Sequence, residues 1–316
     1  MRILVTGSDG FIGSYVCQEL VDQGHTVCGL GLGLTVRNLQ DLLPSRCFHF
    51  LAVNLTRGDP PPGEYDAIVH LAARAGTALS WSEFDDYLAS NVSVTQRLLD
   101  WASRHNVAHF VHVSSSSVYG EFVGGQYDEL QPRRPVSPYG VTKLAAEALV
   151  GAYSRAHALT TTVVRPFSVY GPRQRPDMFV NILIRHALAD ETVTVEGDGE
   201  QERSVTYVED VARALCLVVE SDRGRVDGQV YNVGGNEVVT VNRLVELVGR
   251  RLGVEVKTEH VAGRLGDQRV TVANTQALRR DTGWRPEVCL WDGLGRQVEW
   301  QRYQHNRQEG SLCSWK

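Results

Sequence analysis

A glycine-rich turn near the amino terminus constrains this chain more than any other feature. The apolar run Arg2–Thr6 leads into Gly7-Ser8-Asp9-Gly10-Phe11-Ile12-Gly13, and an amphipathic stretch, Phe11–Asp22, follows. Glycines at this spacing between a strand and a helix permit a tight turn and the close approach of a pyrophosphate, which meets the amide groups at the helix amino terminus. The turn therefore favours a dinucleotide-binding unit over an ordinary glycine-rich connection.

Short apolar runs alternate with helical periodicity through the first half of the chain. The expected strands lie at 26–30, 48–53, 67–71, 109–114 and 161–165, and the expected helices at 87–104 and 138–158. This alternation predicts an α/β fold, a Rossmann-type doubly wound parallel sheet with a smaller carboxy-terminal substrate-binding domain. We expect residues 1–170 to bind the dinucleotide, a segment near 204–232 to return to that domain, and residues 171–316 to bind mainly the substrate.

The charge balance argues against several classes of protein. The 316 residues contain 32 Lys+Arg and 37 Asp+Glu, so the basic excess of a nucleic-acid or membrane-surface protein is missing. No run reaches the roughly 18 apolar residues of a membrane helix, and the start lacks the pattern of a signal peptide. Six scattered cysteines suit a reducing cytoplasm. His105, His109 and His112 straddle different elements, so no metal site is expected.

The second expected strand lacks a carboxylate at its end. A fold of this kind normally places Asp or Glu there to bind the adenosine ribose. Here the strand runs into Gly31-Leu32-Gly33, and Arg37 is the nearest charged side chain. Arg37 either pairs with a 2′-phosphate or is a solvated loop arginine. NAD is the expected cofactor, and NADP stays open.

Tyr139 and Lys143 lie four residues apart at the start of an expected helix and so share one face. An ammonium about 4 Å from a phenol, at an effective dielectric near 20, supplies roughly the 4 kcal/mol that lowers a phenol pKa from about 10 to about 7. Such a pair moves a proton to and from an alcohol. The serines of Ser114–Ser117 follow the strand at 109–114, and we expect them in the same crevice, at the carboxyl ends of the strands.

Taken in order, these segments resemble the extended short-chain dehydrogenase/reductase family, specifically its NAD-dependent nucleotide-sugar epimerases and dehydratases. Within that family the chain is most similar to the UDP-glucuronate 4-epimerases. The matching segments are Gly7–Gly13, His70–Ala73, Asn91-Val92, Ser114–Gly120, Ser137–Tyr139 with Lys143, Arg165–Gly171, 171–178 and Gly197–Gly199.

The resemblance implies roles for individual residues. Ser115 would hydrogen-bond the sugar hydroxyl that is oxidised, Tyr139 would act as the base, and Lys143 would hold the ribose and the tyrosine. The implied cofactor residues are Gly7, Gly10, Phe11, Ile12, Gly13, Arg37, Asn54, Leu55, Leu71, Ala72, Ala73, Asn91, Tyr139 and Lys143. The implied substrate residues are Ser116, Ser117, Ser168 and Arg175 at the sugar, and Arg203 and Arg269 at the diphosphate of a UDP-sugar.

The expected activity is 4-epimerisation of UDP-glucuronate or a related UDP-hexose through a 4-keto intermediate. Dehydratases carry an acidic pair, and decarboxylases a glutamate, where this chain has Ser116 and Ser117. A serine hydroxyl titrates too high for that acid–base work, which disfavours both activities. An NADPH-dependent 4-ketosugar reductase is the nearest alternative, because Gly31 and Arg37 fit it. A non-catalytic dinucleotide sensor is the alternative outside enzymes.

Two other departures from the family bear on the substrate. Ala78 replaces a common arginine, and Ser204 replaces an aspartate. Members of the family are commonly dimeric through the helices expected at 87–104 and 138–158, and Leu144, Ala148 and Leu149 permit such a contact. The resemblance therefore implies a homodimer.

Overall fold

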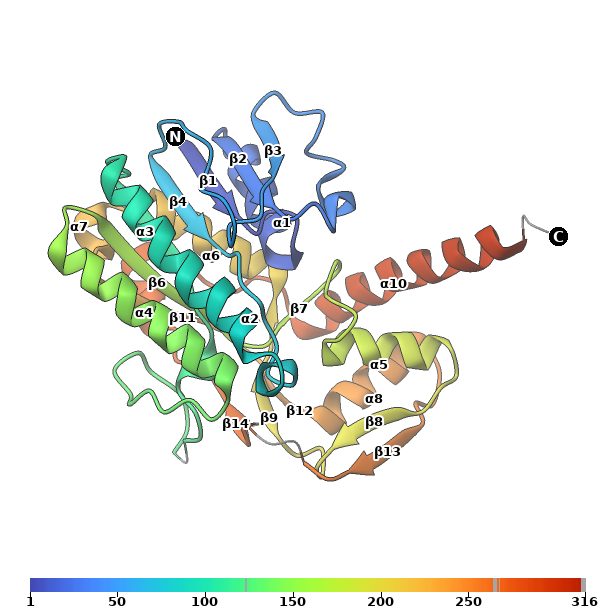
Figure 1. The fold of residues 1–316 in the computed structure, drawn as a ribbon. Helices are drawn as coiled ribbons and strands as arrows, with labels where there is room; N and C mark the ends of the chain where they lie inside the picture. Colours follow the sequence, from blue (N-terminus) through green and yellow to red (C-terminus); the bar gives the residue numbers. More distant parts are fainter. Residues whose placement is uncertain (123, 264–265, 267, 314–316) are drawn as a thin grey trace.

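The computed structural model describes residues 1–122, 124–263, 266 and 268–313 (Figure 1). Its centre is a seven-stranded sheet in which every neighbouring pair is parallel, in the order β11-β6-β5-β4-β1-β2-β3. This order confirms the predicted Rossmann-type, doubly wound fold. The strands are β1 (Arg2–Thr6), β2 (Thr26–Gly31), β3 (Phe48–Ala52), β4 (Ala67–His70), β5 (His109–Val113), β6 (Thr160–Pro166) and β11 (Val230–Val233).

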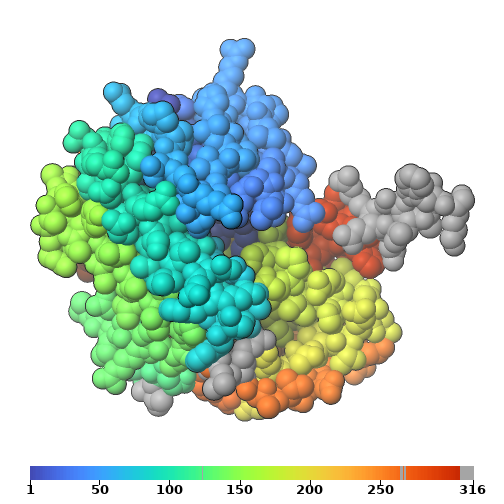
Figure 2. Space-filling view, viewed as in Figure 1, coloured from blue at the N-terminus to red at the C-terminus, as the bar shows by residue number. Residues whose placement is uncertain are grey.

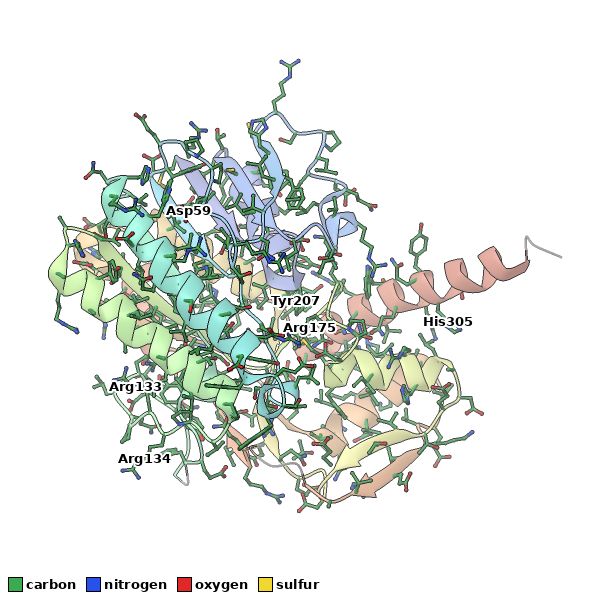
Figure 3. The ribbon with its side chains drawn as sticks, viewed as in Figure 1. Asp59, Arg133, Arg134, Arg175, Tyr207 and His305 are labelled. Atoms are coloured by element: carbon green, nitrogen blue, oxygen red, sulfur yellow. The ribbon has the colours of Figure 1, made fainter. Side chains whose placement is uncertain are left out.

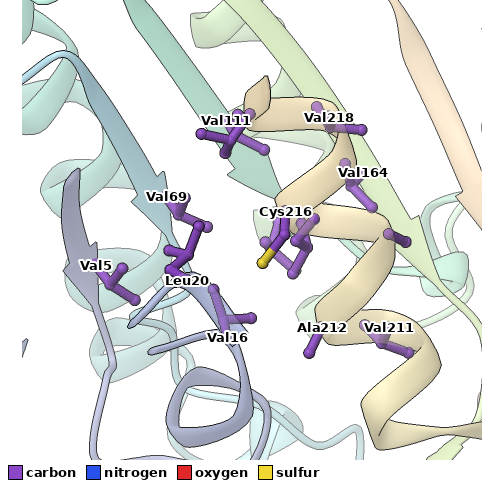
Figure 4. Packing of buried hydrophobic residues seen from close by; sticks show 14 of the residues in the cluster. Val5, Val16, Leu20, Val69, Val111, Val164, Val211, Ala212, Cys216 and Val218 are labelled. Carbon is purple, nitrogen blue, oxygen red and sulfur yellow. The ribbon is translucent and has the colours of Figure 1, made fainter. Parts of the chain in front are cut away.

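Helices cover both faces of the sheet, so successive strand residues are buried on opposite sides. Leu4 and Val5 of β1 are both fully buried but belong to different hydrophobic clusters. Figure 4 shows the cluster on the Val5 side, where α1 and α6 pack on the strands. On one face lie α1 (Phe11–Asp22) and α6 (Val208–Glu220), and on the other lie α3 (Val94–Arg104) and α4 (Pro138–Ala156).

The helix expected at 87–104 is interrupted by a π-helical turn. It consists of α2 (Phe84–Leu88), the turn η3 (Ala89–Ser93) and α3. Such turns occur mostly as single insertions and often at functional sites. Asn91, which the resemblance places at the cofactor, lies in this turn.

A smaller lobe follows the sixth strand of the chain and has its own hydrophobic cluster. The chain leaves this lobe again, since α6 packs on α1 and β11 pairs with β6. The domain boundary at residue 170 remains a prediction. The lobe and its connections contain β7 (Val169–Tyr170), α5 (Phe179–Leu188), β8 (Val193–Glu196), β9 (Glu202–Ser204), β10 (Thr206–Tyr207), α7 (Arg223–Val226), β12 (Val238–Thr240), α8 (Val241–Leu252), β13 (Thr258–Val261), β14 (Val270–Thr271), α9 (Gln276–Thr282) and α10 (Leu290–Cys313).

The surface is hollowed where the amino-terminal half meets the smaller lobe, with the darkest blue, amino-terminal atoms at the floor of the hollow (Figure 2). The last helix, α10, extends away from the rest of the molecule (Figure 1). Within the described ranges, every helix is too short or too polar to cross a lipid bilayer.

Candidate active site

The predicted glycine turn closes so tightly that side chains are excluded. Gly7 has a φ of 70°, in the left-handed region, and a Cβ added there would lie 2.8 Å from the Ala72 nitrogen. A Cβ on Gly13 would lie 2.1 Å from the Gly7 carbonyl oxygen. Glycine is the residue that avoids both clashes. The turn brings Gly7, Gly13 and Ala72, all predicted cofactor residues, together at the carboxyl ends of β1 and β4.

The amino terminus of α1 fits the pyrophosphate of a dinucleotide. Helix α1 starts after Gly10, and no side chain caps it. The first amide groups of a helix lack partners inside it and attract anions. The buried Ser8 hydroxyl, in the same turn, also has no hydrogen-bond partner. Phe11 is buried and Ile12 packs on the core, which fixes the helix against the sheet. The residues present therefore fit NAD.

Asn91 holds the loop after β4 in place. Its Nδ2 donates to the Arg74 carbonyl (3.0 Å) and to the Thr142 hydroxyl (3.0 Å), and its Oδ1 accepts from the Arg74 amide (2.7 Å). Both amide hydrogens are thus used within the protein, and the side chain is 1% exposed. The structure thus shows that Asn91 supports the loop that contains Ala72 and Ala73, and its predicted contact with the cofactor stays a prediction.

Three other predicted cofactor residues lie in the loops after β2 and β3, and their contact with the cofactor stays a prediction. The Leu55 side chain is buried in the hydrophobic cluster that includes residues of α3, and the Asn54 carbonyl Oδ1 accepts from Thr56. The side chains of Asn54 and Leu55 are therefore engaged with the protein itself, which leaves their backbone for a ligand. Arg37 is exposed on the short helix η1 (Val36–Leu39).

The predicted catalytic residues meet where β5 ends and α4 begins. Ser137 caps α4 by accepting from the Gly140 amide (3.1 Å), and Pro138 follows at the first position, a common helix start. Tyr139 and Lys143 are both buried, one turn apart on α4. Ser115 caps the short helix η4 (Ser116–Val118) after β5, and its hydroxyl lies close enough to Tyr139 to affect its ionisation.

Burial controls the ionisation of Tyr139. It raises the pKa of this phenol, whereas the hydroxyl of Ser115 and the guanidinium of Arg175 act in the opposite direction. Lys143 is not among the groups that shift the pKa of Tyr139; its Nζ donates to the Val113 carbonyl at 2.6 Å. The pKa of Tyr139 is therefore raised in this structure, where the sequence argument expected Lys143 to lower it. The reason is desolvation, which the sequence argument left out.

Lys143 itself is affected by the same burial. Removal from water lowers the pKa of Lys143 to about 8, and the carboxylate of Glu147 opposes this shift. Glu147 lies one turn further along α4 and is fixed by two hydrogen bonds from Arg165 (2.8 and 2.6 Å) and one from the Ser114 hydroxyl (2.5 Å). The sequence analysis missed this buried pair, although Glu147 shares the helix face of Tyr139 and Lys143.

Arg175 and Ser168 are the residues predicted at the sugar, and that role stays a prediction. The Arg175 guanidinium forms two hydrogen bonds with the Asp177 carboxylate (2.9 and 2.7 Å) and lies at the junction of the sheet and the smaller lobe (Figure 3). Ser168 follows β6 with a φ of 34°, an uncommon conformation for a residue with a side chain. Tyr87, another residue that the sequence analysis missed, packs edge-on against the Tyr139 ring at 6.2 Å.

Arg203 and Arg269 are far apart in the sequence but adjacent in space. Strand β9 pairs with β14, so the Glu202 amide donates to the Arg269 carbonyl (2.9 Å), as does Arg203 Nη1 (3.3 Å). The guanidinium of Arg269 forms two hydrogen bonds with Asp198 (2.6 and 2.9 Å), and this contact lowers the pKa of Asp198 to about 2. The two arginines predicted at the diphosphate therefore lie next to each other where β9 pairs with β14.

The remaining predicted serines lie next to Ser115. The Ser115 hydroxyl donates to the Ser117 hydroxyl (3.2 Å), and Ser116 begins η4. Among the described residues, no group of three His, Cys, Asp or Glu side chains has the arrangement of a metal site. The candidate site therefore combines the hydroxyls of Ser115 and Tyr139 with Lys143 and Arg175, in a fold whose glycine turn fits a dinucleotide.

Comparison with known proteins agrees with this fold and site. Residues 3–234 match the model of the NAD dependent epimerase/dehydratase family, and the chain belongs to that family. Its cofactor is NAD. The chain is 37% identical over 310 residues to the uncharacterized UDP-glucose epimerase YtcB of Bacillus subtilis (strain 168), covering 94% of this chain and 97% of that protein.

Relatives with different activities are similarly close. A dTDP-glucose 4,6-dehydratase of Actinoplanes sp. is 32% identical, covering 96% of this chain and 98% of the relative. The crystal structure of UDP-glucuronic acid 4-epimerase from Bacillus cereus, in complex with UDP-glucuronic acid and NAD, superposes with a TM-score of 0.91 at 33% identity. It covers 96% of this chain and 100% of that one. The protein is thus an enzyme of a family that contains both epimerases and dehydratases.

Proposed function

We propose that this protein is a nucleotide-sugar 4-epimerase that acts on UDP-glucuronate or a related UDP-hexose. The observation that carries the proposal is the convergence of Ser115 and Arg175 on Tyr139, since both act on the pKa of this phenol. A hydroxyl pair moves a proton at a sugar alcohol, and a guanidinium binds a carboxylate through two parallel hydrogen bonds. The similarity to a structure that binds UDP-glucuronic acid and NAD supports the same substrate class.

In the proposed reaction, Tyr139 takes the proton of the sugar C4 hydroxyl and later returns it, while Ser115 hydrogen-bonds the same oxygen. When bound, NAD supplies the acceptor and the donor of the hydride at C4. The Ser115 hydroxyl and the Arg175 guanidinium lower the pKa of Tyr139 and favour the phenolate that takes the proton, whereas burial raises this pKa and favours the phenol that returns it. Lys143 uses one of its three N–H donors on Val113, which leaves two for ribose hydroxyls.

The sugar side of the site favours epimerisation over elimination. Elimination of water from the ketosugar needs an acid and a base near neutral pKa. Ser116 and Ser117 occupy the two positions next to Ser115, and both are hydroxyls. We therefore propose that the ketosugar keeps its substituents and rotates in the site, so that the hydride returns to its opposite face. The reaction then ends with no net oxidation.

The test is to incubate the purified protein with UDP-glucuronate, and separately with UDP-glucose, and to follow C4 by NMR with NAD added. Inversion at C4 of either sugar supports the proposal. A dehydrated ketosugar or carbon dioxide among the products would replace it with elimination or decarboxylation. Net oxidation of NADPH on a 4-ketosugar would replace it with the reductase.

We further propose that the protein is a cytoplasmic homodimer through α3 and α4. Val141 of α4 and Leu88 of α2 are 46% and 41% exposed, and Ala148 is exposed on the same helix as Val141. Leu144 and Leu149, which were expected at the contact, are half-buried against the protein's own clusters. Sedimentation of the wild type and of Ala148→Arg tests this assembly: a dimer that the substitution splits supports it, and a wild-type monomer refutes it.

A further inference from the structure

We infer that Asp9, from the glycine turn, replaces the carboxylate missing from the end of β2, and that it selects NAD over NADP by binding the adenosine ribose diol. The inference rests on dinucleotide binding and holds whichever sugar the enzyme converts. It corrects the expectation from the sequence that no carboxylate is available at this point. Asp9 lies 22 positions before Gly31, so only the three-dimensional structure shows that the Asp9 carboxylate lies at the end of β2.

The first argument is the place that the Asp9 side chain occupies. Gly31 is the last residue of β2 and pairs with Ala52 of β3. A Cβ built on Gly31 would lie 1.9 Å from Asp9 Oδ1 and 2.6 Å from Asp9 Cγ. The carboxylate of Asp9 therefore fills the space that a side chain at position 31 would take. A Rossmann-type fold normally presents its ribose-binding carboxylate from that position.

The second argument is that the protein holds Asp9 but leaves its charge unbalanced. The Thr35 amide donates to Asp9 Oδ2 (3.2 Å), and the Thr35 hydroxyl and Asn38 Nδ2 both donate to the Asp9 carbonyl oxygen. The residue is 5% exposed. In the described part of the chain, the Thr35 amide is the one donor on this carboxylate, and no lysine, arginine or histidine pairs with it.

The unbalanced charge of Asp9 indicates which ligand groups would bind it. An ionised carboxylate offers about four acceptor positions, and burial of a charge without partners is costly. The 2′ and 3′ hydroxyls of the NAD ribose are two neutral donors, and a Rossmann-type fold binds this ribose beside the end of its second strand. The 2′-phosphate of NADP would put like charges in contact, which disfavours its binding. Arg37, the alternative phosphate ligand, is exposed on η1, and no ion pair joins it to Asp9 among the described residues.

The geometry also explains why position 31 is a glycine. An aspartate there would need the space that Asp9 fills, so the two positions allow one carboxylate between them. Gly31→Asp alone is therefore expected to displace Asp9 and weaken NAD binding. The double variant Asp9→Ala/Gly31→Asp moves the carboxylate back to the strand, and we expect it to recover the preference for NAD.

The experiment measures dissociation constants of NAD and NADP by calorimetry on cofactor-free protein, together with the nucleotide released on denaturation. Asp9→Asn is the central variant, because it keeps the size and the oxygen that accepts from Thr35 but removes the charge. Asp41→Asn is the control, since it removes an exposed carboxylate from the loop after β2. We expect Asp9→Asn to lower the NAD-to-NADP affinity ratio at least tenfold, and Asp41→Asn to leave it unchanged.

Two outcomes would overturn the inference. If Asp9→Asn lowers thermal stability but leaves the affinity ratio unchanged, Asp9 only fastens the loop at Thr35 and Asn38. If the wild type prefers NADP and Arg37→Ala abolishes that preference, Arg37 is a phosphate ligand and Asp9 has no part in selection. Neither measurement uses a sugar, so a failure of the proposed epimerase activity leaves this test unaffected.

Discussion

The predicted cofactor side of the site is formed by backbone atoms, whereas the predicted sugar side is formed by side chains. The cofactor side consists of backbone held at contact distance, in which a Cβ on Gly13 would clash with Gly7 and a Cβ on Gly7 would clash with Ala72. The sugar side consists of long side chains on partly exposed segments. There Arg175 is already paired with Asp177, and Arg269 with Asp198.

This difference explains why the cofactor is easier to assign than the sugar. A cradle of backbone atoms tolerates few changes, whereas the relatives of this chain include proteins named for different nucleotide sugars. An exposed ion pair contributes little to stability and can open toward an anionic ligand. The comparison therefore predicts large effects from small changes on the cofactor side, and substrate-dependent effects on the sugar side.

The largest effect is expected at Tyr139, which is predicted to contact both the cofactor and the sugar. Tyr139→Phe removes the proton carrier and should lower turnover by about 10²- to 10⁴-fold. Its ring is kept, so bound NAD and thermal stability should stay near the wild-type values. Steady-state rates and nucleotide content measure the two effects. Unchanged turnover would show that another group carries the proton, and a wild type that converts none of the tested sugars would instead support a dinucleotide sensor.

On the cofactor side, Gly13→Ala adds a methyl group 2.1 Å from the Gly7 oxygen. Overpacking of this kind costs about 1–3 kcal/mol, so we expect NAD affinity to fall roughly 10- to 100-fold. The matched control is Gly58→Ala, whose Cβ would lie 3.8 Å from the nearest atom. Calorimetric titration with NAD distinguishes the two. Equal affinities in both variants would mean that the turn adjusts more easily than its contacts indicate.

On the sugar side, Arg175→Gln should discriminate between substrates. A hydrogen bond to a charged group contributes about 1.5–3 kcal/mol, so kcat/KM for UDP-glucuronate should fall roughly 10- to 100-fold. The value for UDP-glucose, which has no carboxylate, should change much less. If the two sugars lose the same factor, Arg175 acts on Tyr139 or on the fold and does not recognise the carboxylate.

The smallest effect is expected in the response to acid. Burial lowers the pKa of His70 to about 3 and of His109 to about 4, and it also lowers that of His112. As pH falls below 6.5, the unfolded chain takes up protons that the folded chain does not bind, so stability decreases toward pH 4. All three histidines lie in β4 and β5 of the central sheet.

His112→Leu tests this acid response. Neither ring nitrogen of His112 has a hydrogen-bond partner, so leucine removes a titrating group without breaking a bond. The slope of unfolding free energy against pH between 6.5 and 4 should become shallower by up to about 1.4 kcal/mol per pH unit. Urea denaturation at several pH values measures it. A slope identical to that of the wild type would show that His112 does not contribute.

The fold was predictable because its signals are local. Apolar runs that alternate with helical periodicity describe the parallel sheet, and the glycine spacing describes the turn before α1. Tyr139 and Lys143 share a face because they are four residues apart on one helix. The place of Ser115 follows in the same way from the end of β5.

The sequence argument failed where burial decides the outcome. The pKa of Tyr139 is raised where a lowering was expected, and the contact of Asn91 with the Arg74 backbone was not foreseen. A spacing of four residues states that two side chains share a face. It does not state how much water each one loses, and that loss controls the ionisation of both Tyr139 and Lys143.

Local patterning along the chain thus accounts for the sheet, the dinucleotide turn and the shared helix face of the candidate catalytic residues Tyr139 and Lys143, because each depends on neighbours within one or two turns. Folding in three dimensions set the carboxylate of Asp9 beside Gly31, brought Arg203 next to Arg269, and buried Glu147 against Arg165. These contacts join residues from 18 to 66 positions apart. Their energies depend on the distance between the groups and on the exclusion of water, and neither can be read from the amino-acid sequence alone.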